Sequence, residues 1–268
     1  MSEPVRESPC SLRICVLASG SKGNAIYVSD GRSAILVDAG LSGIEIQRRM
    51  QSAGLSLQAL NAIVVTHEHN DHVRGVGVLS RRFDLPVYIA PRTAVAAASQ
   101  LGRIADLRSF EIGQSFSINE MKLHPFSISH DADDPAGFTI SQNGRKIGIA
   151  TDLGIATGMV KHHLENCALV VLEANHDPVM LAEGPYPWPL KQRIKSRNGH
   201  LSNEDSRDLL GEIKHSGLRH VVLAHLSEIN NRPEKALQTV HQALCNDFPH
   251  TRIQVACQDR CSDIIIIR

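Results

Sequence analysis

The sequence predicts an α/β protein built as a four-layer αββα sandwich, in which two β-sheets lie face to face and helices cover their outer faces. Three observations lead to this fold class. Short apolar runs of strand type recur in both halves of the 268-residue chain. Amphipathic helical stretches lie between and after these runs, and no low-complexity linker divides the chain. Strands grouped in each half, with helices around them, fit two packed sheets.

The first half carries strand-like runs separated by helical stretches. Runs rich in aliphatic and β-branched residues predict strands over 12–17, 25–29, 33–37, 62–65 and 86–90. Apolar residues at helical spacing predict helices over 43–53 and 73–83. Pro91 can open a further helix at its first position, and residues 94–101 continue it.

The second half repeats this style. We expect strands over 121–127, 137–141, 146–150, 169–173, 221–224, 252–256 and 263–267. Ser202 is placed as the N-cap of a helix that runs to about residue 215, with Asp205 near its third position, and another helix covers 233–245. Residues 1–11 are expected to form a disordered tail, and residues 12–268 a single domain of two similar halves.

The composition excludes a global electrostatic attraction to nucleic acid or membrane, because Lys+Arg and Asp+Glu number 28 each. A polyanionic substrate would therefore need a local patch or bound metals. No signal-peptide pattern is present, and the longest aliphatic run, 264–267, is too short to cross a bilayer. The scattered cysteines fit reduced thiols. We expect a soluble cytoplasmic protein.

The run T-H-E-H-N-D-H follows the buried strand at 62–65 and supplies His67, His69, Asp71 and His72. If strand geometry persists past Thr66, His67 and His69 point the same way and can share one metal ion, because alternate strand residues share a face. Asp71 and His72 then begin the next helix and can reach a second metal. A histidine-rich turn without metal is the alternative, and the density of ligands argues against it. Imidazole and carboxylate suit Zn²⁺, Mn²⁺ or Fe without choosing among them.

Three further ligand-type residues each follow an apolar strand. His130, Asp152 and His225 stand directly beyond the runs at 121–127, 146–150 and 221–224. Singly, each is more often a cap or a satisfied surface group. Together with the histidine run, they indicate one common rim where the loops of a sandwich converge.

This constellation resembles the metallo-β-lactamase superfamily, and the resemblance covers nearly the whole chain. Further segments are similar to its YycJ/WalJ-like subgroup, which is associated with nuclease and phosphodiesterase activity; they are residues 17–24, 37–40, 129–135, 173–177, 199–203 and 225–231. The resemblance implies that His67, His69 and His130 hold one metal, that Asp71, His72 and His225 hold another, and that Asp152 bridges them. It also implies a shared metal-bound hydroxide as nucleophile, oriented by Asp71.

Several residues outside the ligand set are candidates for catalysis or substrate binding. His200 is expected to act as general acid or phosphate binder, and His176 as a substrate contact or a support for the site. A loop hydrogen-bonding role is the alternative for both. The segment between them carries Lys191, Arg193 and the only tryptophan, Trp188, so that it can grip a phosphate backbone and stack a base. A solvated helix face is the other reading of this spacing.

The glycine-rich turn at 19–24 is too short for a P-loop, and by itself it is a tight hairpin. The resemblance places it at the metal rim, so Ser21 and Asn24 are expected to line the site. Asn231, in the last similar segment, is expected to bind substrate. Asp38 resembles the aspartate that orders the metal-site loops of this superfamily without binding metal.

These inferences predict a metal-dependent phosphodiesterase acting on nucleic acid, with a 5′–3′ exonuclease on DNA as the favoured reading. A small-molecule phosphodiesterase and a thioester or lactone hydrolase of glyoxalase II type are the alternatives within the hydrolases. A diiron oxidoreductase typically has Glu where His69 stands, and a non-catalytic metal-binding module would not keep every expected ligand. The oligomeric state is left open, with a homodimer as one option.

Overall fold

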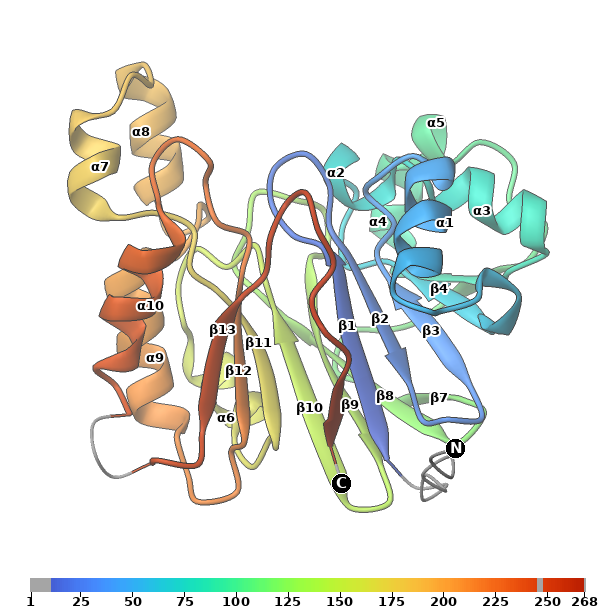
Figure 1. The fold of residues 1–268 in the computed structure, drawn as a ribbon. Coiled ribbons are helices and arrows are strands. Elements are labelled where there is room, and N and C mark those ends of the chain that lie inside the picture. Colours follow the sequence, from blue (N-terminus) through green and yellow to red (C-terminus); the bar gives the residue numbers. More distant parts are fainter. Residues whose placement is uncertain (1–10, 245–247, 268) are drawn as a thin grey trace.

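The computed structural model describes residues 11–244 and 248–267, and within them two seven-stranded sheets lie face to face (Figure 1). Helices cover the outer face of each sheet, so the predicted αββα sandwich is confirmed. The predicted tail at 1–11 falls, except for Ser11, outside the described residues. No helix in the described part of the chain combines the length and apolar character that crossing a membrane requires.

The first sheet holds the N-terminal strands and one strand from the C-terminus. Its order is β14 (Ile265–Ile267), β1 (Leu12–Ala18), β2 (Ala25–Ser29), β3 (Ala34–Val37), β4 (Ala62–Val64), β5 (Val87–Ile89) and β6 (Leu107–Ser109). Strands β14 to β3 pair antiparallel, and β3 to β6 pair parallel. The chain's last strand therefore closes the first sheet and lies outside the half in which it was placed.

The second sheet has the order β13 (Arg252–Val255), β12 (His220–Ala224), β11 (Leu169–Glu173), β10 (Arg145–Ala150), β9 (Ala136–Gln142), β8 (Met121–Ser127) and β7 (Phe116–Ile118). Pairing is antiparallel from β7 to β10 and parallel from β10 to β13. Both sheets thus have a parallel section, whose strands end at the same rim.

The strands are apolar along most of their length because both of their faces are buried. In β1, Ile14 and Val16 face the other sheet, whereas Cys15 and Leu17 face the helices. Burial of both faces explains why these strands read as continuous apolar runs, not as alternating ones. Three packed layers of side chains result, one between the sheets and one under each helical layer.

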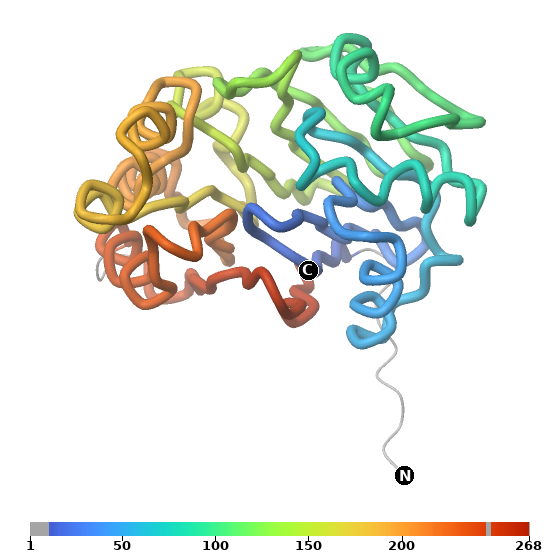
Figure 2. The backbone as a smooth tube through the Cα atoms, turned by 90° about the horizontal axis from the view of Figure 1, so that it is seen from above, coloured from blue at the N-terminus to red at the C-terminus, as the bar shows by residue number. Residues whose placement is uncertain are grey.

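The helices fall into two groups that match the two outer faces (Figure 2). The first sheet is covered by α1 (Gly43–Ser52), α2 (Asn70–Val73), α3 (Val76–Phe83), α4 (Pro91–Ala96) and α5 (Ala98–Leu101), with a short 3₁₀ turn at Leu57–Ala59. The second is covered by α6 (Gly158–Leu164), α9 (Asn203–Ile213) and α10 (Pro233–His241). The predicted cap of α9 is confirmed, since Ser202 and Asp205 form a reciprocal capping box. The helix predicted over 73–83 is confirmed over Val76–Phe83, whereas Val73 belongs to α2. Gly75 lies between the two helices, and a Cβ there would stand 2.3 Å from the Leu41 carbonyl oxygen.

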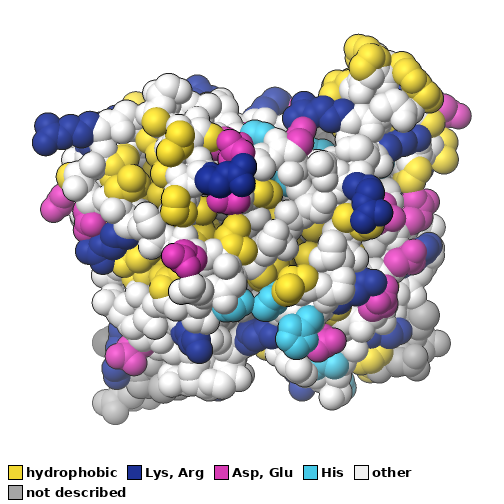
Figure 3. Space-filling view, turned by 180° about the vertical axis from the view of Figure 1, so that it is seen from behind, with side chains coloured by type: hydrophobic (Ala, Val, Ile, Leu, Met, Phe, Trp, Pro, Cys, Tyr) yellow, Lys and Arg dark blue, Asp and Glu magenta, His cyan; other side chains and the backbone are white. Residues whose placement is uncertain are grey.

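Besides the 3₁₀ turn, five short elements of the described chain were not predicted, namely β6, β7, α6, α7 (Pro178–Glu183) and α8 (Trp188–Lys195). All are brief, and β6 and α8 bury no residue, so neither carries a hydrophobic period. We call residues 178–195 the α7–α8 arm. It projects beyond the ends of the sheets at the rim (Figure 1), and hydrophobic side chains gather on its surface (Figure 3). Val179 and Trp188 in this arm are 59% and 70% exposed.

Candidate metal centre

The strand ends bring the predicted ligands together at one rim. Thr66 to His72 follow β4, while His130, Asp152 and His225 follow β8, β10 and β12. The side chains of the seven predicted ligands are all buried or half-buried. The common rim inferred from the sequence is therefore present in the structure.

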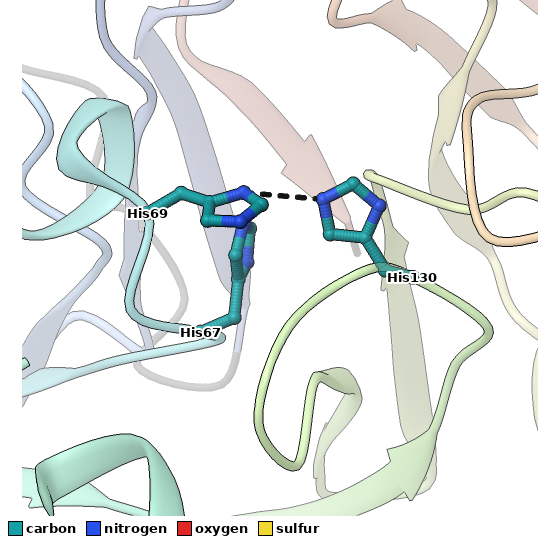
Figure 4. A group of neighbouring side chains, drawn as sticks. All are labelled: His67, His69 and His130. Atoms are coloured by element: carbon teal, nitrogen blue, oxygen red, sulfur yellow. Dashed lines mark hydrogen bonds between the residues drawn. The ribbon is translucent and has the colours of Figure 1, made fainter. Parts of the chain in front are cut away.

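The first group of ligands consists of His67, His69 and His130. One ring nitrogen of each lies within 4.8 Å of those of the other two. His69 Nδ1 and His130 Nε2 are 3.3 Å apart, and the three rings converge from the β4 and β8 ends (Figure 4). Three imidazoles that turn their nitrogens toward one point form the usual donor set for a zinc-type cation.

The second group consists of Asp71, His72 and His225, whose ligand atoms also lie within 4.8 Å of one another. Asp71 Oδ2 is 3.6 Å from both His72 Nε2 and His225 Nε2. Asp152 stands between the two groups, with Oδ2 3.2 Å from His72 Nε2 and Oδ1 3.9 Å from His130 Nε2. One carboxylate is thus within reach of both groups.

Three residues at this rim have left-handed backbone: Asp38 (φ 60°), Asp152 (φ 56°) and His225 (φ 55°). Each comes just after a strand and turns its side chain to the rim. A non-glycine residue held in this region costs about 1–3 kcal/mol, and it persists only where its surroundings fix it. The rim is therefore organised at some expense of stability, as expected of a functional site.

In each of four histidines, a hydrogen bond to Nδ1 fixes the orientation of the ring. His72 Nδ1 donates to Asp38 (2.8 Å), His225 Nδ1 to Glu173 (2.8 Å) and His130 Nδ1 to the Gly199 carbonyl (3.2 Å). The Thr66 hydroxyl donates to Asp38, so it accepts from His67 Nδ1 at 3.0 Å. Each Nε2 is left for a ligand, which is the arrangement that metal-binding histidines require.

The buried polar atoms at this place fit divalent cations. His67 Nε2, Asp152 Oδ2 and His225 Nε2 are buried without a hydrogen-bond partner among the described residues. Burial by itself lowers the pKa of His72 and His225, yet nearby carboxylates, Asp152 foremost, raise the pKa of both rings well above the ordinary value. This excess of negative charge attracts cations, and the donor set supports the use of divalent metal ions.

Glu173 is a component of the site that the sequence analysis did not single out. Its side chain is fully buried at the end of β11. Oε1 accepts from both His200 Nδ1 and His225 Nδ1, at 2.8 Å each, and Oε2 accepts from the backbone amides of Leu153 and Leu201. A carboxylate that ends an apolar strand was the available signal, the same one that drew attention to His130, Asp152 and His225.

We expect Glu173→Gln to lower metal affinity or kcat about 10–100-fold, the usual effect of removing a partner of a metal-binding histidine. Glutamine offers one oxygen where Glu173 now accepts four hydrogen bonds, so an amide NH₂ must face N–H donors. Metal titration and steady-state kinetics measure the effect. The matched control is Glu165→Gln, whose side chain is 55% exposed on the outer face. Equal behaviour of the two variants would refute the role of Glu173.

A pocket of about 240 Å³ opens over the metal centre. Ser21, Arg193 and His200, three of the predicted contacts, line it together with the two ligand groups. His200 holds Glu173 through Nδ1, and its side chain is 21% exposed. These three residues are therefore placed where a substrate can meet them.

Four other expected contacts do not line this pocket. Asn24 is buried beneath the centre and donates to Asp71 Oδ2 at 3.2 Å. Asn231 is buried and bonds to Asn203 and to the backbone of residues 174 and 175. Both side-chain amides are therefore engaged in holding loops together.

The other two are His176 and Lys191. The side chain of His176 is buried and does not line the pocket, and burial lowers its pKa to about 4. Lys191 donates to the Ala182 carbonyl and ties α8 to α7. Trp188 also stands outside the pocket and is 70% exposed.

Gly40 allows three loops of the centre to close on one another. A Cβ there would stand 1.6 Å from the Asp71 carbonyl oxygen. We expect Gly40→Ala to displace Asp71, to weaken metal binding and to destabilise the fold by about 1–3 kcal/mol, as overpacking does. Thermal melting and metal titration test this. Gly211→Ala is the control, because nothing lies within 4 Å of that position in α9 and alanine favours helix there.

Comparisons with known proteins agree with this geometry. Residues 33–226 match the β-lactamase superfamily domain. The chain is 39% identical over 235 residues to exodeoxyribonuclease YycJ of Bacillus anthracis, covering 87% of this chain and 89% of the relative. It is 35% identical over 237 residues to exodeoxyribonuclease WalJ of Streptococcus pneumoniae, covering 87% and 88%.

The fold also matches a solved structure. The metallo-β-lactamase fold protein YhfI of Bacillus subtilis superposes with a TM-score of 0.73 at 15% identity, over 94% of this chain and 99% of that one. A similarity at this level of identity concerns the fold alone. The match of the domain and the identity to the two relatives go further, and they show that this chain belongs to the metallo-β-lactamase superfamily, in its YycJ/WalJ-like subgroup.

Proposed function

We propose that the protein is a metal-dependent phosphodiesterase that cleaves DNA as an exonuclease. The observation that carries the proposal is the composition of one pocket. Two groups of metal ligands, with Asp152 between them, meet there. His200, held by the buried Glu173, and Arg193 also line it. Two of its relatives are named exodeoxyribonucleases, which supports DNA as substrate. Cytoplasmic location, where DNA is accessible, belongs to the same proposal.

In this proposal His67, His69 and His130 hold one divalent cation, and Asp71, His72 and His225 hold the other. Asp152 lies between the two groups and contacts both. When bound, two cations such as Zn²⁺ or Mn²⁺ supply an activated water and neutralise negative charge on the phosphate. The Asp71 carboxylate lines the pocket and accepts a hydrogen bond from the attacking water.

His200 serves as the proton donor to the leaving oxygen. Its Nδ1 donates to Glu173 at 2.8 Å, which fixes the ring and leaves Nε2 for the substrate. The Glu173 carboxylate also stabilises the protonated ring, as an orienting carboxylate does in a catalytic triad. Arg193 at the pocket edge offers donors for a phosphate oxygen.

The small volume of the pocket also suits a small phosphodiester, which makes a small-molecule phosphodiesterase the second candidate. The test is an assay of the metal-loaded protein on labelled single- and double-stranded DNA, on RNA and on bis(p-nitrophenyl) phosphate. We expect cleavage of DNA that EDTA abolishes and Mn²⁺ or Zn²⁺ restores. Cleavage of the small ester alone would favour the second candidate and refute the nuclease proposal.

A further inference from the structure

The metal pocket has an apolar part that the cleavage chemistry does not use. Tyr186, Leu190 and Ile194 line it from the α7–α8 arm. Leu190 and Ile194 are four residues apart, so they share one face of α8. The pocket therefore joins a metal-binding part, suited to a phosphate, with an apolar and aromatic part contributed by the arm.

Tyr186 is an aromatic ring without a partner. It is half-buried, and within the described part of the chain it makes no ring contact, hydrogen bond or ion pair. Its neighbour Trp188 points elsewhere, being 70% exposed and outside the pocket lining. The arm thus presents one free aromatic face next to the metal centre, which is what a nucleobase stacks on.

Arg193 joins the arm to the metal loops. Its Nε lies 2.5 Å from Asp131 Oδ2, and the other oxygen of Asp131 is 3.4 Å from His130 Nε2. Its two terminal nitrogens have no hydrogen-bond partner among the described residues. Asp131 therefore holds the guanidinium by one side, and the free edge can bind a phosphate through two parallel hydrogen bonds.

The dimensions of the pocket limit what can enter. Its volume of about 240 Å³ is below the roughly 300–1,000 Å³ of most small-ligand sites. His67, His72 and Asp152 beneath it are at most 2% exposed, so a scissile phosphate must pass through this pocket to reach them. The end of a base-paired duplex is much larger than this pocket, since the major groove of a duplex is by itself about 12 Å wide.

From this geometry we infer that the pocket takes a single unpaired nucleotide, with its base stacked on Tyr186 and a neighbouring phosphate held by Arg193. The inference rests on the proposed nuclease function and specifies its substrate as single-stranded DNA or a frayed duplex end. A matched duplex end must first open. Opening is unfavourable by a few kcal/mol, and least so at a mismatch, so the state of the terminal base pair controls the rate.

The first test compares three DNAs of one sequence: a single strand, a blunt matched duplex and a duplex with two terminal mismatches. We expect the single strand and the frayed duplex to be cleaved about 10-fold faster than the matched duplex, or more. Equal rates on matched and frayed ends would overturn the inference and leave the nuclease proposal standing. Binding of the same DNAs, followed by fluorescence anisotropy, should show the same order. If no DNA is cleaved but the three DNAs still bind in this order of affinity, only the nuclease proposal is overturned.

The second test combines a protein change with a substrate change. Tyr186→Ala should lower kcat/KM on single-stranded DNA about 10-fold, and Tyr186→Phe should keep it. The kcat/KM of the wild-type protein should fall by the same factor on a strand whose terminal nucleotide is abasic. On that abasic strand, Tyr186→Ala should cause no further fall in kcat/KM. Trp188→Ala is the matched control and should leave the rate unchanged. Melting temperature and metal content establish that each variant is folded and loaded. Additive losses for Tyr186→Ala and the abasic site would refute the stacking contact.

Discussion

Replacing Asp152 by asparagine will lower kcat/KM for DNA cleavage about 10³-fold or more and will reduce the metal content of the purified protein. Asp152 is the carboxylate that contacts both ligand groups, 3.2 Å from His72 Nε2 and 3.9 Å from His130 Nε2. Bound cations supply several kcal/mol of stabilisation in phosphoryl transfer, and each 1.36 kcal/mol is a factor of ten in rate. An amide, which is neutral, removes the negative charge that the two cations would share.

The fold should survive this change, because asparagine has the same shape and the strand before it is part of the core. Metal analysis, circular dichroism and kinetics on one preparation give the three readouts. Asp133→Asn is the matched control: this carboxylate is 52% exposed and pairs with Arg92 on the surface. An Asp152→Asn protein with full metal content and full activity would contradict the assignment of the centre.

The ligands could be predicted from the sequence because the fold concentrates chemistry at strand ends. Each apolar run marks a buried strand, and the first polar residues beyond it must lie at the rim. His130, Asp152 and His225 were found by that rule, although they are far from the T-H-E-H-N-D-H run in sequence. Strands β8, β10 and β12 run in the same direction in the second sheet, so the residues that follow them meet at one rim.

The roles of polar residues next to the ligands could not be predicted in the same way. Asn24 and Asn231 stand in segments that belong to the site, yet their amides bond to other loops. An amide that binds substrate and one that holds a loop have the same chemistry, and only the direction of the side chain separates them. His176 and His200 pose the same problem: one is buried behind the pocket and the other lines it.

The α7–α8 arm escaped prediction for a different reason. α8 buries no residue, so its sequence has no hydrophobic period to mark a helix. Of the basic residues and the tryptophan that drew attention to this segment, Arg193 lines the pocket, whereas Lys191 and Trp188 do not, and the unpredicted Tyr186 does. Charge and aromatic content indicated the right segment without indicating which of its side chains face the metals.

The other large expected effect is that of His200→Ala on the rate of DNA cleavage, in which the leaving group is a sugar alkoxide. Loss of a general acid lowers the rate about 10²–10⁴-fold, and we expect this loss in kcat on DNA. Metal content should stay near that of the wild type, because His200 Nδ1 is engaged with Glu173 and its ring belongs to the pocket wall.

The nature of the leaving group separates an acid from a residue that merely shapes the pocket. p-Nitrophenolate leaves without a proton, whereas the sugar alkoxide of DNA needs one. His200→Ala should therefore retain most of its activity on bis(p-nitrophenyl) phosphate while it loses activity on DNA. A general distortion of the pocket would lower both rates together, because both substrates must reach the same buried centre beneath His69 and Asp71. Equal losses on the two substrates would exclude His200 as the proton donor.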